Sequence, residues 1–164
     1  NPTAAAKNVP YSITLYGIDQ TLIQQVSGSL DLPPGTTRPV YIPGVTSGHQ
    51  KVANAFLEIA SSSPQWFTLT SDSRIIPTVS NTALGGSTSA PRITAMLTNP
   101  SITVLSNVQV IVFVRDARND VIAASRTVVS SIPAQGQATA TFTWNNAFSD
   151  IPTAIEVVPV VPLP

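Results

Sequence analysis

The fold is decided at Val108–Val114, where the sequence reads VQVIVFV. Val, Ile and Phe suit a pleated strand, and a nearly continuous apolar run is typical of a strand covered on both faces or central in a sandwich. Two other stretches alternate instead, YSITLY at 11–16 and TATFTW at 139–144. Alternation places every second side chain on one face, and the predicted core residues are Ile13, Leu15, Val110, Val112, Phe142 and Trp144.

Turn-forming sequences separate these runs at intervals of about ten residues, as in an antiparallel sandwich. They are PPG at 33–35, PG at 43–44, GG at 85–86 and PAQG at 133–136. Only the segment 52–60 is ambiguous, because its apolar residues also fit one face of a helix. We favour a strand there, because the segment takes part in an internal repeat.

The repeat has a period near 99 residues, the size of an immunoglobulin-like domain. Asn1-Pro2 matches Asn99-Pro100, and Tyr11, Ile13 and Leu15 match Val110, Val112 and Val114. The other matched segments are 8–9 with 107–108, 17–20 with 116–120, 22–23 with 121–122, 32–35 with 132–136, and 55–59 with 154–158. We predict an all-β chain of two tandem immunoglobulin-like antiparallel β-sandwiches, at 1–72 and 73–164, divided near 71–74.

The two copies differ in what precedes them. Two strand-like runs, 75–83 and 92–98, come before the second Asn-Pro pair, whereas the first copy begins at Asn1-Pro2. A sandwich without such strands exposes unpaired backbone and a split core. We therefore expect the first domain to lack its first strands. Either the natural protein is longer upstream, or another chain supplies a strand by strand addition between subunits.

The composition argues against an enzyme and against a nucleic-acid binder. The formal net charge is zero, 10% of residues are charged, there is no Cys, and His49 is the only His. The scattered Lys and Arg form no basic stripe, and His49 lies in a polar, loop-like stretch. No apolar run is long enough to span a membrane. We predict no catalytic residue, no cofactor and no metal site.

One group of residues, Asp116, Asn119 and Asp120, has side chains of the kind that bind a metal ion. These residue types suit calcium, but they do not make a full oxygen shell. A hairpin turn explains them better, because Asp and Asn favour turns.

The chain resembles the FxLYD-type immunoglobulin-like domains of bacterial exported proteins. The residues at the place of that motif are Phe113–Asp116 and Leu15–Asp19. More closely, the chain is similar to uncharacterised membrane-anchored surface proteins of candidate-phylum bacteria. The segments that carry this likeness are 40–48, 64–66, 121–127, 142–144 and 155–159. The resemblance implies an extracellular, cell-surface location, and an upstream anchor as the sole link to a membrane, but no ligand.

The leading functional prediction is a structural or adhesive protein, a repeating unit of a cell-surface filament, pilus or envelope layer. Its partners would be copies of itself or other surface proteins. The predicted assembly contacts are Tyr11, Ile13, Leu15, Val160, Val161 and Leu163, since an apolar C-terminal run could lie on the next subunit's first domain. The alternatives are a simple surface spacer and a carbohydrate-binding module, in which Trp66 or Tyr41 would stack on a glycan.

Overall fold

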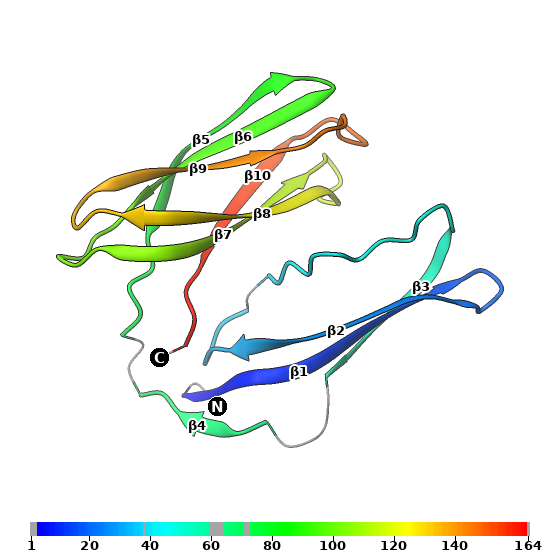
Figure 1. The fold of residues 1–164 in the computed structure, drawn as a ribbon, viewed down its shortest axis with the longest axis horizontal. Coiled ribbons are helices and arrows are strands. Elements are labelled where there is room, and N and C mark those ends of the chain that lie inside the picture. The colour runs from blue at the N-terminus through cyan, green and yellow to red at the C-terminus, as the bar shows by residue number, and fades with distance from the viewer. Residues whose placement is uncertain (1–2, 38, 60–63, 71–72, 164) are drawn as a thin grey trace. The chain divides into compact units, whose positions relative to one another are not determined.

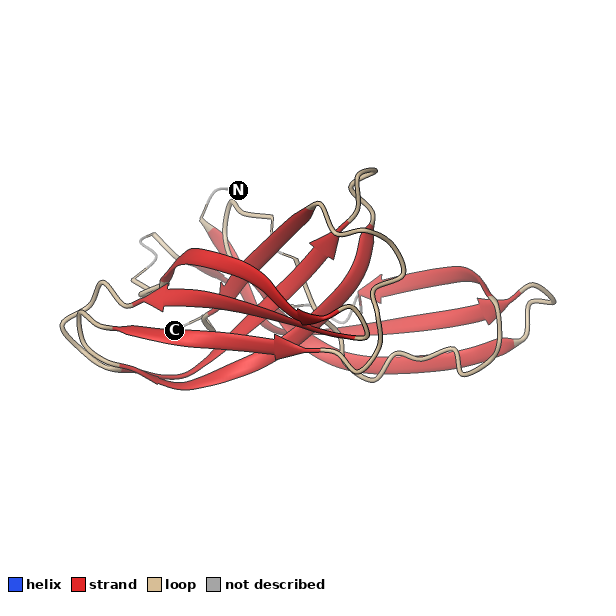
Figure 2. Ribbon diagram, turned by 90° about the horizontal axis from the view of Figure 1, so that it is seen from above, coloured by secondary structure: helices blue, strands red, loops and turns tan. Residues whose placement is uncertain are grey.

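The computed structural model describes residues 3–37, 39–59, 64–70 and 73–163. All regular structure in these ranges is β-strand and none is helical (Figure 2), so the all-β prediction is confirmed. The chain forms two compact units, one of residues 1–73 with 163–164 and one of residues 74–162. Part of the predicted boundary, 71–72, lies outside the described residues.

In its described residues the first unit is a single antiparallel sheet (Figure 1). Its central strand is β1 (Ala4–Gly17), with β2 (Leu22–Leu32) along one edge. The other edge of β1 pairs with β3 (Val52–Ile59) and, at Ala4–Ala6, with β4 (Trp66–Thr68). The strand prediction for 52–60 is thus confirmed over Val52–Ile59, and residue 60 lies outside the described residues.

The second unit contains two three-stranded antiparallel sheets (Figure 1). One sheet has the order β5-β6-β9, with β5 (Thr78–Ser87), β6 (Ala90–Thr98) and β9 (Gln137–Thr143). The other has the order β10-β7-β8, with β7 (Leu105–Arg115), β8 (Val121–Ile132) and β10 (Ala154–Val160). Buried side chains of both sheets form one core, which makes this unit a β-sandwich.

The predicted core is correct at four of its six positions. Leu15, Val110, Val112 and Phe142 are buried, whereas Ile13 and Trp144 are only half-buried. Trp144 follows the end of β9 and packs edge-to-face on Phe148, with ring centroids 5.1 Å apart. Ile13 lies in the unit whose described residues form no second sheet.

The internal repeat is visible as two equivalent hairpins, β1–β2 and β7–β8. The amide of Gly17 donates to the Thr21 carbonyl, and Asp116 donates to Asp120 in the same way. Asn8 and Asn107 share a positive φ, as do Gln20 and Asn119. In each hairpin the strand register shifts just before the turn, between residues 15 and 16 in β1 and between residues 114 and 115 in β7.

The backbone corrects the alignment of the two copies after residue 32. Gly35 and Gln135 share the positive φ of the corner, and Leu15 pairs with Ala55 as Val114 pairs with Ile155. The offset is therefore 100 residues from 32 to 59, so our sequence match of 55–59 with 154–158 is wrong by one residue. The extra residue lies in β8, before Ile132.

The Gly85-Gly86 pair is not a turn. Both residues belong to β5, and the turn of the β5–β6 hairpin lies at residues 88–89. Gly86 has a φ of 81°, and a Cβ there would collide with the carbonyl oxygen of Ala90. The glycine therefore permits a close approach of the two strands, which the sequence pattern does not distinguish from a turn.

The Asn-Pro corner can be described only in the second copy, because Asn1 and Pro2 lie outside the described residues. The Asn99 side chain is fully buried. Its amide nitrogen donates to the carbonyls of Thr103, Ile132 and Pro133, and its side-chain oxygen accepts from the amide of Ser101. This Asn thus stabilises the entry to β7 by satisfying backbone groups that a buried corner would otherwise leave unpaired.

Candidate functional site

The most unusual surface of the chain is one side of the first unit's sheet, which we call the apolar face. Alternation and strand pairing place eight side chains on it: Tyr11, Ile13 and Leu15 of β1, Gln24 and Val26 of β2, and Ala55, Leu57 and Ile59 of β3. None of them carries a charge. Leu57 is 61% exposed and Ile59 is 46% exposed, so the β3 side of this face is open to solvent.

The second unit shows how the same face is covered when a sandwich is complete. Val112 of β7 corresponds to Ile13, and Val157 of β10 corresponds to Leu57. Val112 is fully buried, in a core that contains Ile93 of β6 and Phe142 of β9. Burying a Leu or Ile side chain contributes about 1.5–3 kcal/mol, so the apolar face forgoes stabilisation that its counterpart obtains.

Two features cover part of the apolar face. The Tyr11 ring lies over Gly28 of β2, where a Cβ would come too close to the Tyr11 hydroxyl oxygen and ring carbons. Gln24, the partner of Leu15 in β2, donates to the Gly44 carbonyl and accepts from the amide of Thr46. Leu15 is buried, whereas Ile13 is half-buried and Leu57 and Ile59 are exposed, so we call these last three residues the open part of the face.

β3 is exposed along its whole length and on both sides. On the side away from the apolar face, Phe56 is 58% exposed and packs edge-to-face with Tyr16, at a centroid distance of 5.9 Å. In the described residues β3 pairs only with β1, so its other edge is unpaired there. An exposed apolar edge strand is a template for pairing with another chain.

The predicted glycan-stacking residues are not brought together. Trp66 is 59% exposed and lines a hollow of about 570 Å³ together with Lys7, Asn8 and Gln65. Tyr41 is half-buried in the stretch between β2 and β3 and does not line that hollow. Trp66 alone therefore has the exposed ring and polar neighbours that a glycan site requires.

The predicted assembly contacts fall into two groups. Tyr11 and Ile13 are half-buried and Leu15 is buried, all on the apolar face. Val160 and Val161 are half-buried, and the Val161 carbonyl accepts a hydrogen bond from the guanidinium of Arg74. Leu163 is buried in the first unit of its own chain, where its amide donates to Asp31. Leu163 thus packs within its own chain, and a contact of the tail with another subunit stays a prediction.

The candidate calcium ligands Asp116, Asn119 and Asp120 form a hairpin turn. One oxygen of the buried Asp116 accepts from the amides of Arg118 and Asp120, and the other accepts from the Arg118 guanidinium. Burial raises the pKa of Asp116, but these hydrogen bonds outweigh it and hold the pKa below its usual value. Arg118 also contacts Asp120 and Asp150, at 3.4 and 3.5 Å. Its charge is thus shared among three carboxylates.

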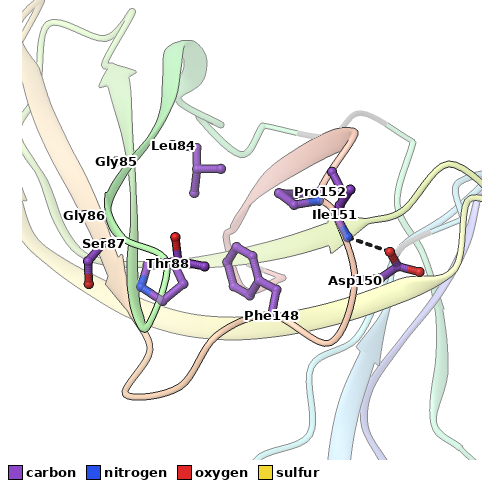
Figure 3. Close-up of a pocket in the computed structure, with 10 residues that line it drawn as sticks. Leu84, Gly85, Gly86, Ser87, Thr88, Phe148, Asp150, Ile151 and Pro152 are labelled. Carbon is purple, nitrogen blue, oxygen red and sulfur yellow. Dashed lines mark hydrogen bonds between the residues drawn. The ribbon is translucent and has the colours of Figure 1, made fainter.

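A second hollow, of about 530 Å³, lies in the second unit (Figure 3). Leu84–Thr88 of the β5–β6 hairpin form one wall, and Phe148 and Asp150–Pro152 form the other. Asp150 is its only charged group and already contacts Arg118. The Asp150 carboxylate also accepts from the amide of Ile151, at 2.7 Å. The hollow brings together no acid–base pair and no nucleophile with a base.

No cluster of three or more His, Cys, Asp or Glu side chains that could hold a metal occurs among the residues that the structure describes. His49 is exposed in the stretch between β2 and β3. Within the described ranges there is also no helix that could cross a membrane.

Sequence reasoning singled out the apolar face through β1 but missed Leu57 and Ile59. The strand pairing of β1 with β3 reveals them, and the only signal in the sequence was the repeat itself. Comparisons with protein-family models and with curated proteins found no match.

Proposed function

We propose that the chain is a non-enzymatic structural and adhesive protein of the cell surface. In this proposal it is a repeating unit of a filament, pilus or envelope layer, built from immunoglobulin-like domains. The second unit acts as a self-contained spacer, and the first unit binds another polypeptide through its apolar face. The observation that carries this proposal is the exposure of Leu57 and Ile59 on a face whose counterpart in the second unit is a buried core.

Two physical points support a role in association. An uncharged sheet face with large exposed side chains is the kind of surface that marks an interaction site. The unpaired edge of β3, in the described residues, adds backbone groups that a second strand can use. Neither point calls for catalysis.

Electron microscopy and light scattering on the 164-residue chain test this function. We expect assemblies larger than a monomer, and we expect Leu57→Ser to disrupt them. The matched control is Ile102→Ser, which removes an equally large apolar side chain, 81% exposed, from the second unit. If the chain is a monomer at all concentrations and binds no other protein, assembly is contradicted and only the spacer function stands.

Glycan binding is a second candidate, favoured by the exposure of Trp66 beside Lys7, Asn8 and Gln65. Titration with a glycan panel should shift the fluorescence of Trp66 if a sugar ring stacks on it. Trp66→Phe should retain binding, because it keeps an aromatic platform, and Trp66→Ala should lose it. An unchanged spectrum across a broad panel would remove this candidate.

A further inference from the structure

The first unit contains a segment that corresponds to a strand but does not form one. At the offset of 100 residues, β9 (Gln137–Thr143) corresponds to residues 37–43. The described members of that segment, residues 37 and 39–43, belong to no strand. In the second unit β9 pairs only with β6. In the part of the chain that the structure describes, residues 37 and 39–43 are thus without the strand that holds their counterparts in place.

The side chains of this segment suit a strand in the place of β9. Ala140 and Phe142 of β9 point into the core of the second unit, and their counterparts are Val40 and Ile42. Both counterparts are apolar, and Val40 is 49% exposed. A strand at 39–43 would bring these two side chains toward the open part of the apolar face.

The two prolines of the segment are compatible with the same role. The amide of Trp144 donates to the Pro91 carbonyl, at the start of β6. Because amides alternate along a strand, the even-numbered amides of β9 point toward β6 and the odd-numbered ones away from it. Pro39 and Pro43 correspond to odd-numbered positions, so they remove donors only from the outer edge. Val40 and Ile42 keep their backbone amide donors, which would face the strand in the place of β6.

We propose that the apolar face of the first unit binds a β-hairpin, in the place that β5–β6 takes in the second unit. The hairpin has small or branched apolar side chains at alternate positions, as β6 has Ile93, Ala95 and Leu97. Its inner strand pairs with Val40 and Ile42, which become part of a strand, and its apolar side covers Ile13, Leu57 and Ile59. The face carries no charge, so the covering side carries none.

This inference rests on the proposed function, since it names the partner of the same face. The probe is a synthetic peptide of residues 75–98, the chain's own β5–β6 sequence, added to the 164-residue chain. The control peptide carries serine in place of Ile93 and Leu97. Binding is measured by fluorescence anisotropy, and ordering by amide hydrogen exchange.

We expect the peptide to bind one per chain and the control peptide not to bind. Exchange at the amides of Val40 and Ile42 should slow, and exchange at Tyr41, whose amide would face outward, should not. Leu57→Ser should weaken binding by about tenfold or more. Phe56→Ser is the matched control, since its side chain is equally exposed on the other side of the same strand, and it should leave binding unchanged.

Three results would overturn the inference. Equal binding of both peptides, binding that Leu57→Ser does not weaken, or unchanged exchange at Val40 and Ile42 would each do so. Face-to-face dimers of the chain, broken by Leu57→Ser and not displaced by the peptide, would instead assign the face to a second copy. If the peptide binds as expected but the chain never assembles, the proposed function fails and the hairpin site stands.

Discussion

The backbone amide of Leu163 donates a hydrogen bond to a carboxylate oxygen of Asp31, 3.1 Å away and 132 positions earlier in the chain. The other oxygen of Asp31 accepts from the amide of Asn8, at 3.1 Å. One carboxylate thus joins the last described residue, the bulge of β1 and the end of β2. The Leu163 side chain is buried, so the contact combines a charge-assisted hydrogen bond with apolar burial.

Leu163→Ala should therefore destabilise the first unit by about 2–5 kcal/mol, the usual cost of truncating a buried Leu. Single-tryptophan backgrounds make the measurement specific: Trp66 in a Trp144→Phe chain reports on the first unit, and Trp144 in a Trp66→Phe chain reports on the second. In urea unfolding, the Trp66 transition should move to lower denaturant and the Trp144 transition should not. An unmoved Trp66 transition would show that the tail does not support this unit.

Truncation of an apolar strand residue should have unequal costs in the two units. Phe142→Ala removes a buried core residue and should cost about 3–5 kcal/mol. Ile13→Ala removes a half-buried side chain from the apolar face and should cost less than about 2 kcal/mol. The same two fluorescence transitions measure both costs. Equal losses would mean that Ile13 is covered in solution as fully as a core residue.

The sequence predicted best what depends on local pattern. Period-two alternation and the turn residues at 17–20 and 116–120 identified both hairpins, because a hairpin's register is set by its own turn. The burial of Ile13, and whether residues 39–43 form a strand, depend on a partner strand that no local pattern reveals. The turn predicted at Gly85-Gly86 is wrong for a related reason. A glycine that permits two strands to approach closely has the same sequence signature as a glycine in a turn.

The two glycines of β5 should respond differently to a methyl group. Gly86→Ala should destabilise the second unit by about 1–3 kcal/mol, because φ is 81° there and the Cβ would meet the backbone of Ala90. Gly85→Ala is the matched control, since its Cβ would meet only the Arg92 carbonyl oxygen, at 4.0 Å. Thermal unfolding of the two variants measures the difference. If both variants are as stable as the parent chain, the two strands are far enough apart at Gly86 to accept a methyl group.

The pH dependence of the second unit should report on Asp116. Its pKa is lowered below the ordinary value of 3.8 by its hydrogen bonds, so the folded state favours the ionised carboxylate. A lowered folded pKa stabilises the protein above the unfolded value, and that stabilisation is lost as the pH falls through 3.8 toward the folded value. Asp116→Asn removes the charge, so the variant should be less stable than the parent at pH 7.

The gap between Asp116→Asn and the parent should then narrow as the pH falls from about 5 to below the folded pKa, where Asp116 is itself neutral. Asp120→Asn is the control for a carboxylate in the same turn, since its side chain is 71% exposed and its contact with Arg118 is a longer one of 3.4 Å. It should change the melting temperature little at any pH, because exposed ion pairs contribute little. Thermal unfolding of the three proteins, followed by Trp144 fluorescence between pH 7 and 2.5, makes the comparison. A stability gap for Asp116→Asn that does not change with pH would show that its carboxylate acts by shape and hydrogen-bond geometry, not by charge.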